Sequence, residues 1–275
     1  MAGNDSVTGS DEIDELAGRD GDDSLSSGAG ADSVWGDRGD DVLTLGDGDD
    51  RGIGADGNDT LFGGAGDDEV SGDAGNDVVY GGAGNDQATG GFGDDVIYMG
   101  DGDDNNQGYG YRGQGSDTVY GGNGNDTINE GHGRDLIFGE GGNDVLLVSA
   151  ESPNDEAGQR APDTVDGGTG DDTIRAGSED ILTGGEGADV FQVMNELEPF
   201  GAAVITDFDT SQDVLQITTF DADLPDTAAF SLVYDAPTDS VLLMRGATTM
   251  VSLQGLDEGD IANVEFAVTG PALAG

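Results

Sequence analysis

The fold of this chain is decided by a nine-residue unit, seen most clearly in Gly63-Gly64-Ala65-Gly66-Asp67-Asp68-Glu69-Val70-Ser71 and again in Gly81-Gly82-Ala83-Gly84-Asn85-Asp86-Gln87-Ala88-Thr89. Both copies follow the template G-G-x-G-[ND]-D-x-U-x, in which U is apolar. The register is unbroken from the start of the chain to residue 107. A fixed period of this kind is the sequence signature of a solenoid or another repeat architecture.

Aspartate occupies the sixth position of every unit. Insertions near 108–111 and 148–157 shift the phase of this column, and the unit that gives Asp180 is one residue short. The column begins with Asp5 and Asp14, in glycine-poor turns, and continues through Asp23, Asp32, Asp41, Asp50, Asp59, Asp68, Asp77, Asp86, Asp95, Asp104, Asp117, Asp126, Asp135, Asp144, Asp163, Asp172, Asp180 and Asp189. It predicts a row of carboxylates along a stack of turns.

Each unit has the local chemistry of a turn followed by a short strand. Glycines at positions one, two and four suit positive φ, Asn or Asp at position five tolerates the left-handed region, and positions seven to nine favour a strand. The eighth position is apolar, as in Leu61 and Val79, so one side chain per unit points inward. Gly52, Ala88 and Asn106 interrupt this row and predict thin places in the core. We expect an all-β, right-handed parallel β-roll: a two-sheet solenoid with two units per coil.

Charge limits the class of partner. The 275 residues include 59 acidic and 8 basic side chains, which give a net charge of −51, and there is no lysine. Nucleic acid and anionic membrane surfaces are disfavoured, because binding them depends on Lys and Arg clusters. No cysteine is present for a disulfide or a thiolate metal site. No apolar run has membrane-spanning length and no signal-peptide pattern opens the chain, so we expect no membrane span and export by another route.

The repeats resemble those of the RTX (repeat-in-toxin, hemolysin-type) calcium-binding proteins, whose motif is G-G-x-G-x-D-x-U-x. The resemblance covers roughly residues 1–192. It implies a parallel β-roll with calcium between the turns. It also implies a chain that is disordered in the calcium-poor cytosol and folded outside the cell.

The residues themselves lead to the same ion. One buried aliphatic side chain gains about 1.5–3 kcal/mol, too little to order nine backbone residues. Coils about 4.8 Å apart would also bring carboxylates close enough to repel by roughly 1–3 kcal/mol per pair. Ca²⁺ accepts six to eight oxygens, which carboxylates and turn carbonyls supply, whereas Mg²⁺ demands tighter octahedral geometry. We expect metal ligands along the column from Asp23 to Asp189 and on the order of fifteen ions, with folding and binding as one process.

Beyond residue 192 the glycine density falls and alternating apolar stretches appear, such as Val214-Leu215-Gln216-Ile217. We expect residues 193–275 to form antiparallel strands that cap the open end of the roll. The run Ile205-Thr206-Asp207-Phe208-Asp209, followed by Asp213-Val214-Leu215, resembles the segment after the last repeat in type I secreted proteins. Two interpretations stay open for these residues, an uncleaved export signal for type I machinery and a plain structural cap.

The residues that common hydrolases need are missing from this sequence. The single histidine, His132, lies at the third position of a unit, where we expect an ordinary exposed turn residue. Zinc proteases of the H-E-x-x-H type need two histidines, and no G-x-S-x-G elbow occurs. The regular metal array explains the abundant carboxylates better than a glycosidase pair does. We expect no catalytic residue and no enzyme activity.

The outward positions of the two sheets differ. Sorting units by parity places aromatic residues at position nine of one sheet, with apolar residues beside them at position seven: Phe62, Tyr80, Tyr98, Tyr120 and Phe138, with Val78, Val96 and Leu136. The other sheet is mostly polar, with Trp35 and Ile53 as its larger apolar members. We interpret the aromatic row either as a contact surface, for self-association, cell-surface material or glycan, or as a stack that stabilises the sheet. Both insertions follow the same parity and should emerge from one edge.

Three functional hypotheses follow. The leading one is a secreted, extracellular calcium-binding scaffold or adhesin-like protein, exported by a type I system and folded by external Ca²⁺. The second is a secretion and folding module of an exported enzyme whose catalytic domain is lost or lies on another polypeptide. The third is an ice- or crystal-surface binder, which regular outward Thr ladders would favour, yet Thr recurs only sporadically at positions seven and nine.

Overall fold

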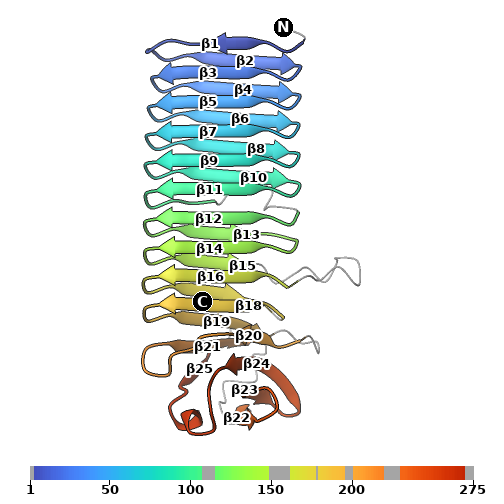
Figure 1. Ribbon diagram of the computed structural model, residues 1–275, viewed down its shortest axis with the longest axis vertical. Helices are drawn as coiled ribbons and strands as arrows, with labels where there is room; N and C mark the ends of the chain where they lie inside the picture. The colour runs from blue at the N-terminus through green and yellow to red at the C-terminus, as the bar shows by residue number, and fades with distance from the viewer. Residues whose placement is uncertain are drawn as a thin grey trace, which may run out of the picture.

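The computed structural model describes residues 3–106, 115–148, 162–177, 179–195, 201–219 and 230–269. Over these ranges the chain winds into a stack of coils (Figure 1). Each regular coil contributes one strand to each of two sheets. Neighbouring coils pair in parallel, with Leu61 opposite Val79 and Gly52 opposite Val70. The predicted parallel, two-sheet β-solenoid is confirmed.

We call the two sheets sheet I and sheet II. The parallel strands of sheet I are β1 (Ser6–Thr8), β3 (Ser24–Ala29), β5 (Val42–Asp47), β7 (Thr60–Ala65), β9 (Val78–Ala83), β11 (Val96–Asp101), β12 (Thr118–Asn123), β14 (Leu136–Gly141), β16 (Thr164–Thr169), β18 (Ile181–Glu186) and β20 (Ala203–Ile205). Sheet II has two parts. The first consists of β2 (Glu15–Asp20), β4 (Ser33–Arg38), β6 (Arg51–Asp56), β8 (Glu69–Ala74) and β10 (Gln87–Phe92), and the second of β13 (Thr127–Glu130), β15 (Val145–Val148), β17 (Thr173–Ala176), β19 (Val190–Asn195), β21 (Val214–Thr219) and β25 (Phe266–Thr269).

The strands are longer than positions seven to nine predict. Strand β7 runs from position seven of one unit, Thr60, to position three of the next, Ala65. It can do so because glycines at positions one and two bring no Cβ against the neighbouring coil. A Cβ on Gly64, for example, would collide with the carbonyl oxygen of Gly46.

The core contains two rows of side chains where one was predicted. The eighth-position row is buried, and the first position also faces inward because the alternation of a strand continues through it. Where the first position is not glycine it adds a second core side chain, and Leu45 and Met99 are fully buried in this way. A Cβ on Gly52 would lie 2.9 Å from Leu45 Cδ1, so Leu45 fills the thin place predicted at Gly52. The expectation of a single apolar side chain per unit is therefore wrong for these coils.

Glycine serves two different purposes in the unit. Positive φ occurs at the second and fourth positions, as in Gly64 (φ 122°) and Gly66 (φ 129°). Among the described residues of the full-length units, first-position glycines such as Gly63 and fifth-position residues such as Asp67 have no positive φ; Glu179 (φ 74°), before Asp180 in the shortened unit, is an exception. The prediction of positive φ at position one and of a left-handed residue at position five is therefore wrong, and both positions need another explanation.

Sheet II is interrupted between β10 and β13, whereas sheet I is continuous there. Within the described residues, Asn105 pairs with Gln87 on one side and Thr127 on the other, and the Asn106 backbone N–H donates to the Thr127 carbonyl oxygen at 3.1 Å. Asn106, predicted as an imperfection in the core, is buried; its Oδ1 accepts the Asn129 backbone N–H at 2.6 Å and its Nδ2 donates to Glu130 Oε1. A polar pair thus takes the place of apolar packing at this coil. Both predicted insertions and their common edge fall largely within residues 107–114 and 149–161, which lie outside the described residues.

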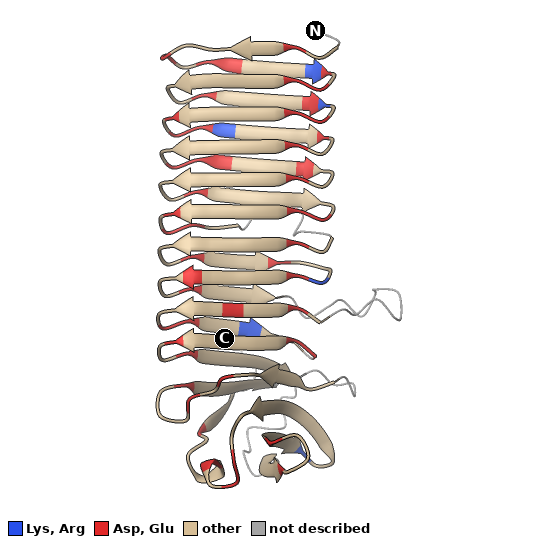
Figure 2. Cartoon of the chain, in the orientation of Figure 1, with Lys and Arg blue, Asp and Glu red and all other residues tan. Residues whose placement is uncertain are grey.

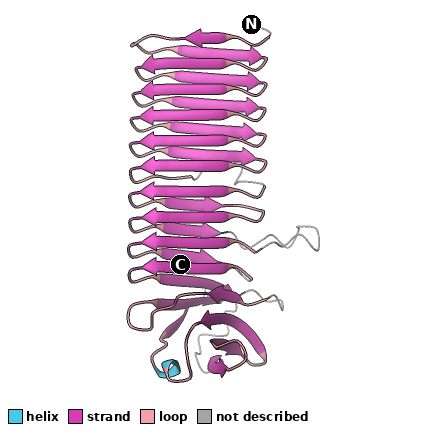
Figure 3. Cartoon of the chain, in the orientation of Figure 1, coloured by secondary structure: helices cyan, strands magenta, loops and turns pink. Residues whose placement is uncertain are grey.

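The C-terminal strands continue both sheets before they fold back. Strand β20 pairs in parallel with β18, and β21 with β19. Strands β22 (Phe230–Asp235), β23 (Ser240–Arg245) and β24 (Thr248–Gln254) form an antiparallel meander, and β24 also pairs in parallel with β20. The antiparallel prediction is thus correct for the meander and wrong for β20, β21 and β25. A short 3-10 helix, η2 (Asp260–Ala262), completes this β-rich cap, and no helix in the described part of the chain could span a membrane (Figure 3).

Candidate metal centre

The sixth-position aspartates from Asp23 to Asp189 are buried and tie successive coils together, whereas Asp5 and Asp14 are half-buried. The Oδ1 of each accepts the backbone N–H of the aspartate one coil earlier: Asp41 N–H donates to Asp59 Oδ1 at 2.7 Å, and Asp59 N–H to Asp77 Oδ1 at 2.7 Å. Asp59 and Asp77 are each only 1% exposed. Because the chain makes two turns per coil, the aspartates form two such ladders, one on each edge of the roll.

The second carboxylate oxygen of most of these aspartates has no partner. Buried Oδ2 atoms with no hydrogen bond within the described part of the chain belong to Asp23, Asp32, Asp41, Asp50, Asp59, Asp68, Asp77, Asp86, Asp95, Asp104, Asp126, Asp144, Asp172 and Asp189. A buried oxygen that carries charge costs folding free energy unless something pairs with it. The Oδ2 atom lacks a hydrogen-bond partner in coil after coil, so each of these coils needs a positive charge at the same place.

First-position glycines leave the room in which these oxygens lie. A Cβ added to Gly139 would collide with both Asp144 Oδ2 and the carbonyl oxygen of Gly167 in the next coil. A Cβ on Gly167 would meet Asp172 Oδ2 and the carbonyl oxygen of Gly184 in the same way. The glycine is therefore required by a carboxylate oxygen and a backbone carbonyl oxygen that converge beside it. This replaces the explanation by positive φ.

Burial shifts the ionisation of the row. Desolvation is the largest cause and raises the pKa of Asp59, Asp68 and Asp95 to about 7 and that of Asp117 to about 8. Neighbouring carboxylates raise the pKa of Asp59 further, whereas the backbone N–H that it accepts lowers it. Without added positive charge, the folded row favours protonated carboxyl groups.

A second ladder, which the sequence reasoning did not identify, runs beside the first. Fifth-position side chains accept the backbone N–H of the fifth residue in the following coil, as in Asn58 N–H to Asp40 Oδ1 and Asn76 N–H to Asn58 Oδ1, both 2.8 Å. Its direction is opposite to that of the sixth-position ladder. The preference for Asn or Asp at position five was its only signal, since both offer an acceptor oxygen of the same reach.

The two ladders border a groove on one turn edge. It encloses about 550 Å³ and includes sixth-position Asp32, Asp50, Asp68 and Asp86 with fifth-position Asp49, Asp67, Asn85 and Asp103. In the described residues no three His, Cys, Asp or Glu side chains gather around one point, so a bound cation would depend on backbone carbonyl oxygens as well. Orphaned carboxylate oxygens next to carbonyl oxygens form an all-oxygen donor set, which suits Ca²⁺.

Two aspartates of the column differ from the rest: Asp14, which precedes the predicted ligands, and Asp180, which is one of them. Asp14 Oδ2 accepts the Ser10 backbone N–H at 2.6 Å, and Asp180 Oδ2 accepts the Gly177 backbone N–H at 2.8 Å. These two carboxylates are therefore satisfied by the chain itself. Asp117 and Asp163 keep the ladder bond through Oδ1. Asp213 extends the ladder beyond Asp189, whose backbone N–H donates to Asp213 Oδ1 at 3.0 Å, and its irregular spacing hid it in the sequence.

The other singled-out residues also have defined places. His132 is half-buried in its turn, where its carbonyl oxygen accepts the Gly115 backbone N–H at 3.0 Å, so the expectation of an exposed side chain is wrong. The predicted aromatic row lies on the outer face of sheet I. Its rings stack in order Phe62, Tyr80, Tyr98, Tyr120 and Phe138, with centroids 4.8 to 5.0 Å apart.

A family model for the RTX calcium-binding nonapeptide repeat (4 copies) matches this chain repeatedly. The matches cover residues 1–34, 8–43, 17–52, 44–79, 53–88, 71–105, 111–146 and 158–191. They include most of the solenoid, and every described orphaned aspartate lies inside them. No curated protein matches the chain.

Three solved structures show a similar fold. A hyperactive, Ca²⁺-dependent, β-helical antifreeze protein from an Antarctic bacterium is 23% identical, with a TM-score of 0.33, 82% of this chain and 78% of that chain covered. The extracellular lipase LipA from Serratia marcescens is 18% identical, with a TM-score of 0.26, and the match covers 88% of this chain but 40% of the lipase. The AlgE6R3 subunit of the Azotobacter vinelandii mannuronan C5-epimerase is 21% identical, with a TM-score of 0.26, 73% of this chain and 85% of that chain covered.

Proposed function

The chain belongs to the RTX calcium-binding nonapeptide repeat family, and on that premise we propose that it is a secreted scaffold that folds when calcium fills its turns outside the cell. The observation that carries this proposal is the repeated buried Oδ2 atom that has no partner in the described chain. A globular core would place such atoms against a donor. Here the same atom stays unmatched along both edges, as a row of dication sites requires.

In each turn, different atoms fix the spacing of the coils and bind the cation. Asp59 Oδ1 fixes the coil spacing through the Asp41 backbone N–H, while Asp59 Oδ2 stays free for a cation. First-position glycines keep that oxygen and a carbonyl oxygen within reach of one another. Calcium, when bound, supplies the positive charge that offsets the row of carboxylates. Folding and ion binding are then one equilibrium, because the unfolded chain holds no such row.

Export and extracellular location follow from the same coupling. A chain that stays unfolded where calcium is scarce can be threaded through a type I exporter and folds only after release. The segment from Ile205 to Asp213, which resembles the region behind the last repeat of type I substrates, is our candidate for recognition by that machinery. The folded product is a rigid rod that acts by binding and display, not by catalysis.

Circular dichroism during a calcium titration, with magnesium as control, tests the proposal. We expect strand signal to appear cooperatively with Ca²⁺ and not with Mg²⁺. Asp59→Asn keeps the ladder acceptor and removes the charge, so it should raise the calcium midpoint about tenfold, as the loss of a charged buried contact does. Asp56→Asn removes the same charge from an exposed side chain in the same coil and should leave the midpoint unchanged.

Two results would count against the proposal. One is a chain that is equally rich in strand in excess chelator. The other is an equal shift of the midpoint by Asp59→Asn and Asp56→Asn, which would mean that overall charge, and not the buried row, controls folding.

A further inference from the structure

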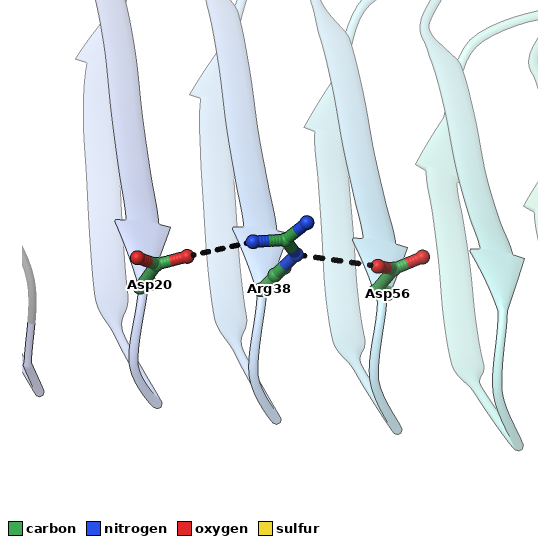
Figure 4. Close-up of polar contacts among 3 residues, drawn as sticks. All are labelled: Asp20, Arg38 and Asp56. Carbon is green, nitrogen blue, oxygen red and sulfur yellow. Dashed lines mark hydrogen bonds and ion pairs between the residues drawn. The ribbon is translucent and has the colours of Figure 1, made fainter.

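The two outer faces of the solenoid differ sharply in charge. On sheet II, Arg51 and Glu69 pair at 3.4 Å at the outward first residues of β6 and β8, and Arg19, Asp37 and Asp73 occupy exposed outward positions farther along their strands. At the strand ends of the same sheet, Arg38 lies between Asp20 at 3.4 Å and Asp56 at 3.7 Å (Figure 4). On sheet I, strands β3 to β12 show acidic residues only toward their ends (Figure 2). The outward positions of these strands are Ser24, Ser26, Gly28, Val42, Thr44, Gly46, Thr60, Phe62, Gly64, Val78, Tyr80, Gly82, Val96, Tyr98, Gly100, Thr118, Tyr120 and Gly122. We call this uncharged surface, with Leu136 and Phe138 of β14, the ladder face.

The aromatic residues of the ladder face form one continuous stack. Successive ring planes lie within 4 to 10° of parallel, so each inner ring has both faces covered by its neighbours. The edges of the rings therefore point outward, and Phe62 and Tyr98 are each 38% exposed. Sugars bind aromatic platforms by lying on open ring faces, which this stack does not present. The stack therefore presents to a partner a flat apolar surface on which ring edges repeat at a constant spacing.

We propose that the ladder face docks on the ladder face of a second copy of this chain. The inference rests on the proposed function, because only the calcium-ordered coils bring the rings into one stack. The first partner of the scaffold is then another copy of the same chain.

The period of the ladder is the first argument. Rings repeat every 4.8 to 5.0 Å, and a second copy repeats with the same step by construction. The row of ring edges of one copy can therefore lie beside the row of the other, in register along the whole stack, as rows of side chains do between two packed sheets. A two-fold axis makes the contact self-complementary and closes it at two copies. An unrelated surface would match this step at one ring and lose register over the next.

Charge is the second argument. The chain has a net charge of −51, and on the order of fifteen Ca²⁺ would offset only about 30 of it. Any contact through sheet II or the turn edges would bring carboxylates of two copies together. On the ladder face the described outward side chains of β3 to β12 are all uncharged, so two copies can meet there with the acids left at the rim.

The area of the ladder face sets the expected affinity between two copies. Strands of six residues, at about 3.3 Å each, and seven strands about 4.8 Å apart make a face of roughly 600 Å². A contact that buries about 1,200 Å² in total stands at the lower end of specific interfaces. We expect a reversible dimer with micromolar dissociation. Two acids mark where the uncharged face ends. They are Glu140, an exposed outward residue of β14, and Asp166, which follows Phe138 in the ninth-position column.

Sedimentation velocity of the full chain in saturating calcium, from about 1 to about 100 μM, tests the inference over the range that such an interface predicts. We expect the wild type to pass from monomer to dimer. Val78→Glu with Val96→Glu puts two charges on the ladder face and leaves every stacked ring in place, so it should stay monomeric. Ser71→Glu with Thr89→Glu adds the same two charges to the outer face of sheet II and should dimerise like the wild type.

Circular dichroism of the same samples separates this inference from the proposed function. If all variants fold with calcium but the wild type stays monomeric throughout, the second-copy inference is wrong and calcium-driven folding stands. If Val78→Glu with Val96→Glu dimerises as the wild type does, the interface lies elsewhere. If the wild type is monomeric but sediments with crystalline cellulose, and the Val78→Glu, Val96→Glu variant does not, the face binds glycan and the inference is overturned.

Discussion

The first-position glycine shows how one residue can serve the ion site without entering it. Gly139 has no positive φ among the described glycines, and it has a strand geometry that alanine could adopt. What forbids a side chain is the approach of Asp144 Oδ2 and the Gly167 carbonyl oxygen. A methyl group there would displace the two oxygens that the turn holds ready for calcium. Glycine is therefore needed at this position because of the space it leaves, and not because of its backbone conformation.

Gly139→Ala should therefore weaken calcium-dependent folding. Overpacking a close-packed site costs about 1–3 kcal/mol, which we expect to appear as a lower midpoint of urea unfolding in saturating calcium. Gly141→Ala, two residues later in β14, is the matched control. Its added Cβ would lie 3.5 Å from Thr169 Oγ1 and 3.8 Å from Asn123 Oδ1 and the Gly122 carbonyl oxygen, which are ordinary contacts. Equal effects of the two substitutions would mean that loss of glycine flexibility, and not the oxygen pair, governs the site.

At the scale of the strands, Leu45 and Gly52 share one space in the core, because the side chain of Leu45 occupies the place beside Gly52. The first-position leucine of β5 reaches across to the place where β6 lacks its eighth-position side chain. The template puts glycine at position one and an apolar residue at position eight, and this coil exchanges the two. The same offset of seven residues separates buried Met99 from Asn106. In both places the template is broken, but a first-position side chain stays buried in the core.

Restoring the template should restore the stability that one change removes. Leu45→Gly alone empties a buried site and should cost about 2–5 kcal/mol of unfolding free energy. Gly52→Val alone should also destabilise, because its methyl groups meet Leu45. The double variant recreates the ordinary unit, and we expect it to recover most of the loss in a double-mutant cycle by urea unfolding. Additive losses would show that the two positions do not share one space.

Sequence reasoning predicted the elements that depend on period and missed those that depend on contact across coils. The Asp column, the parallel pairing and the ring stack all follow from side chains that recur at a constant spacing. The fifth-position ladder and the crowding beside Gly139 depend on which atom faces which in the neighbouring coil. Asp213 and Asp180 keep the ladder bond through Oδ1, but where the spacing is irregular a local backbone N–H, from Asp209 or Gly177, also reaches their Oδ2.

For the whole molecule, protons and calcium compete for the same row of oxygens. Burial raises the pKa of Asp41, Asp77 and Asp126 to about 6 and that of Asp59, Asp68 and Asp144 to about 7. Each carboxyl thus binds a proton more tightly in the coil than in the unfolded chain, where an aspartate titrates near 4. The stability that protonation contributes is full below about pH 4 and is lost as pH rises through about 6 to 7.

Acid should therefore replace part of the calcium requirement. In excess chelator, we expect circular dichroism to show more strand at about pH 5.5 than at about pH 8, because the folded row then carries protons in place of ions. The calcium midpoint of folding should accordingly be lower at about pH 5.5 than at about pH 8, since protons on the row already supply part of the stability. Asp59→Asn with Asp68→Asn removes two of the groups whose pKa is raised and should flatten both responses, whereas exposed Asp56→Asn should not. A calcium midpoint that stays constant between these two pH values would show that the carboxyl groups hold no protons in the folded coil.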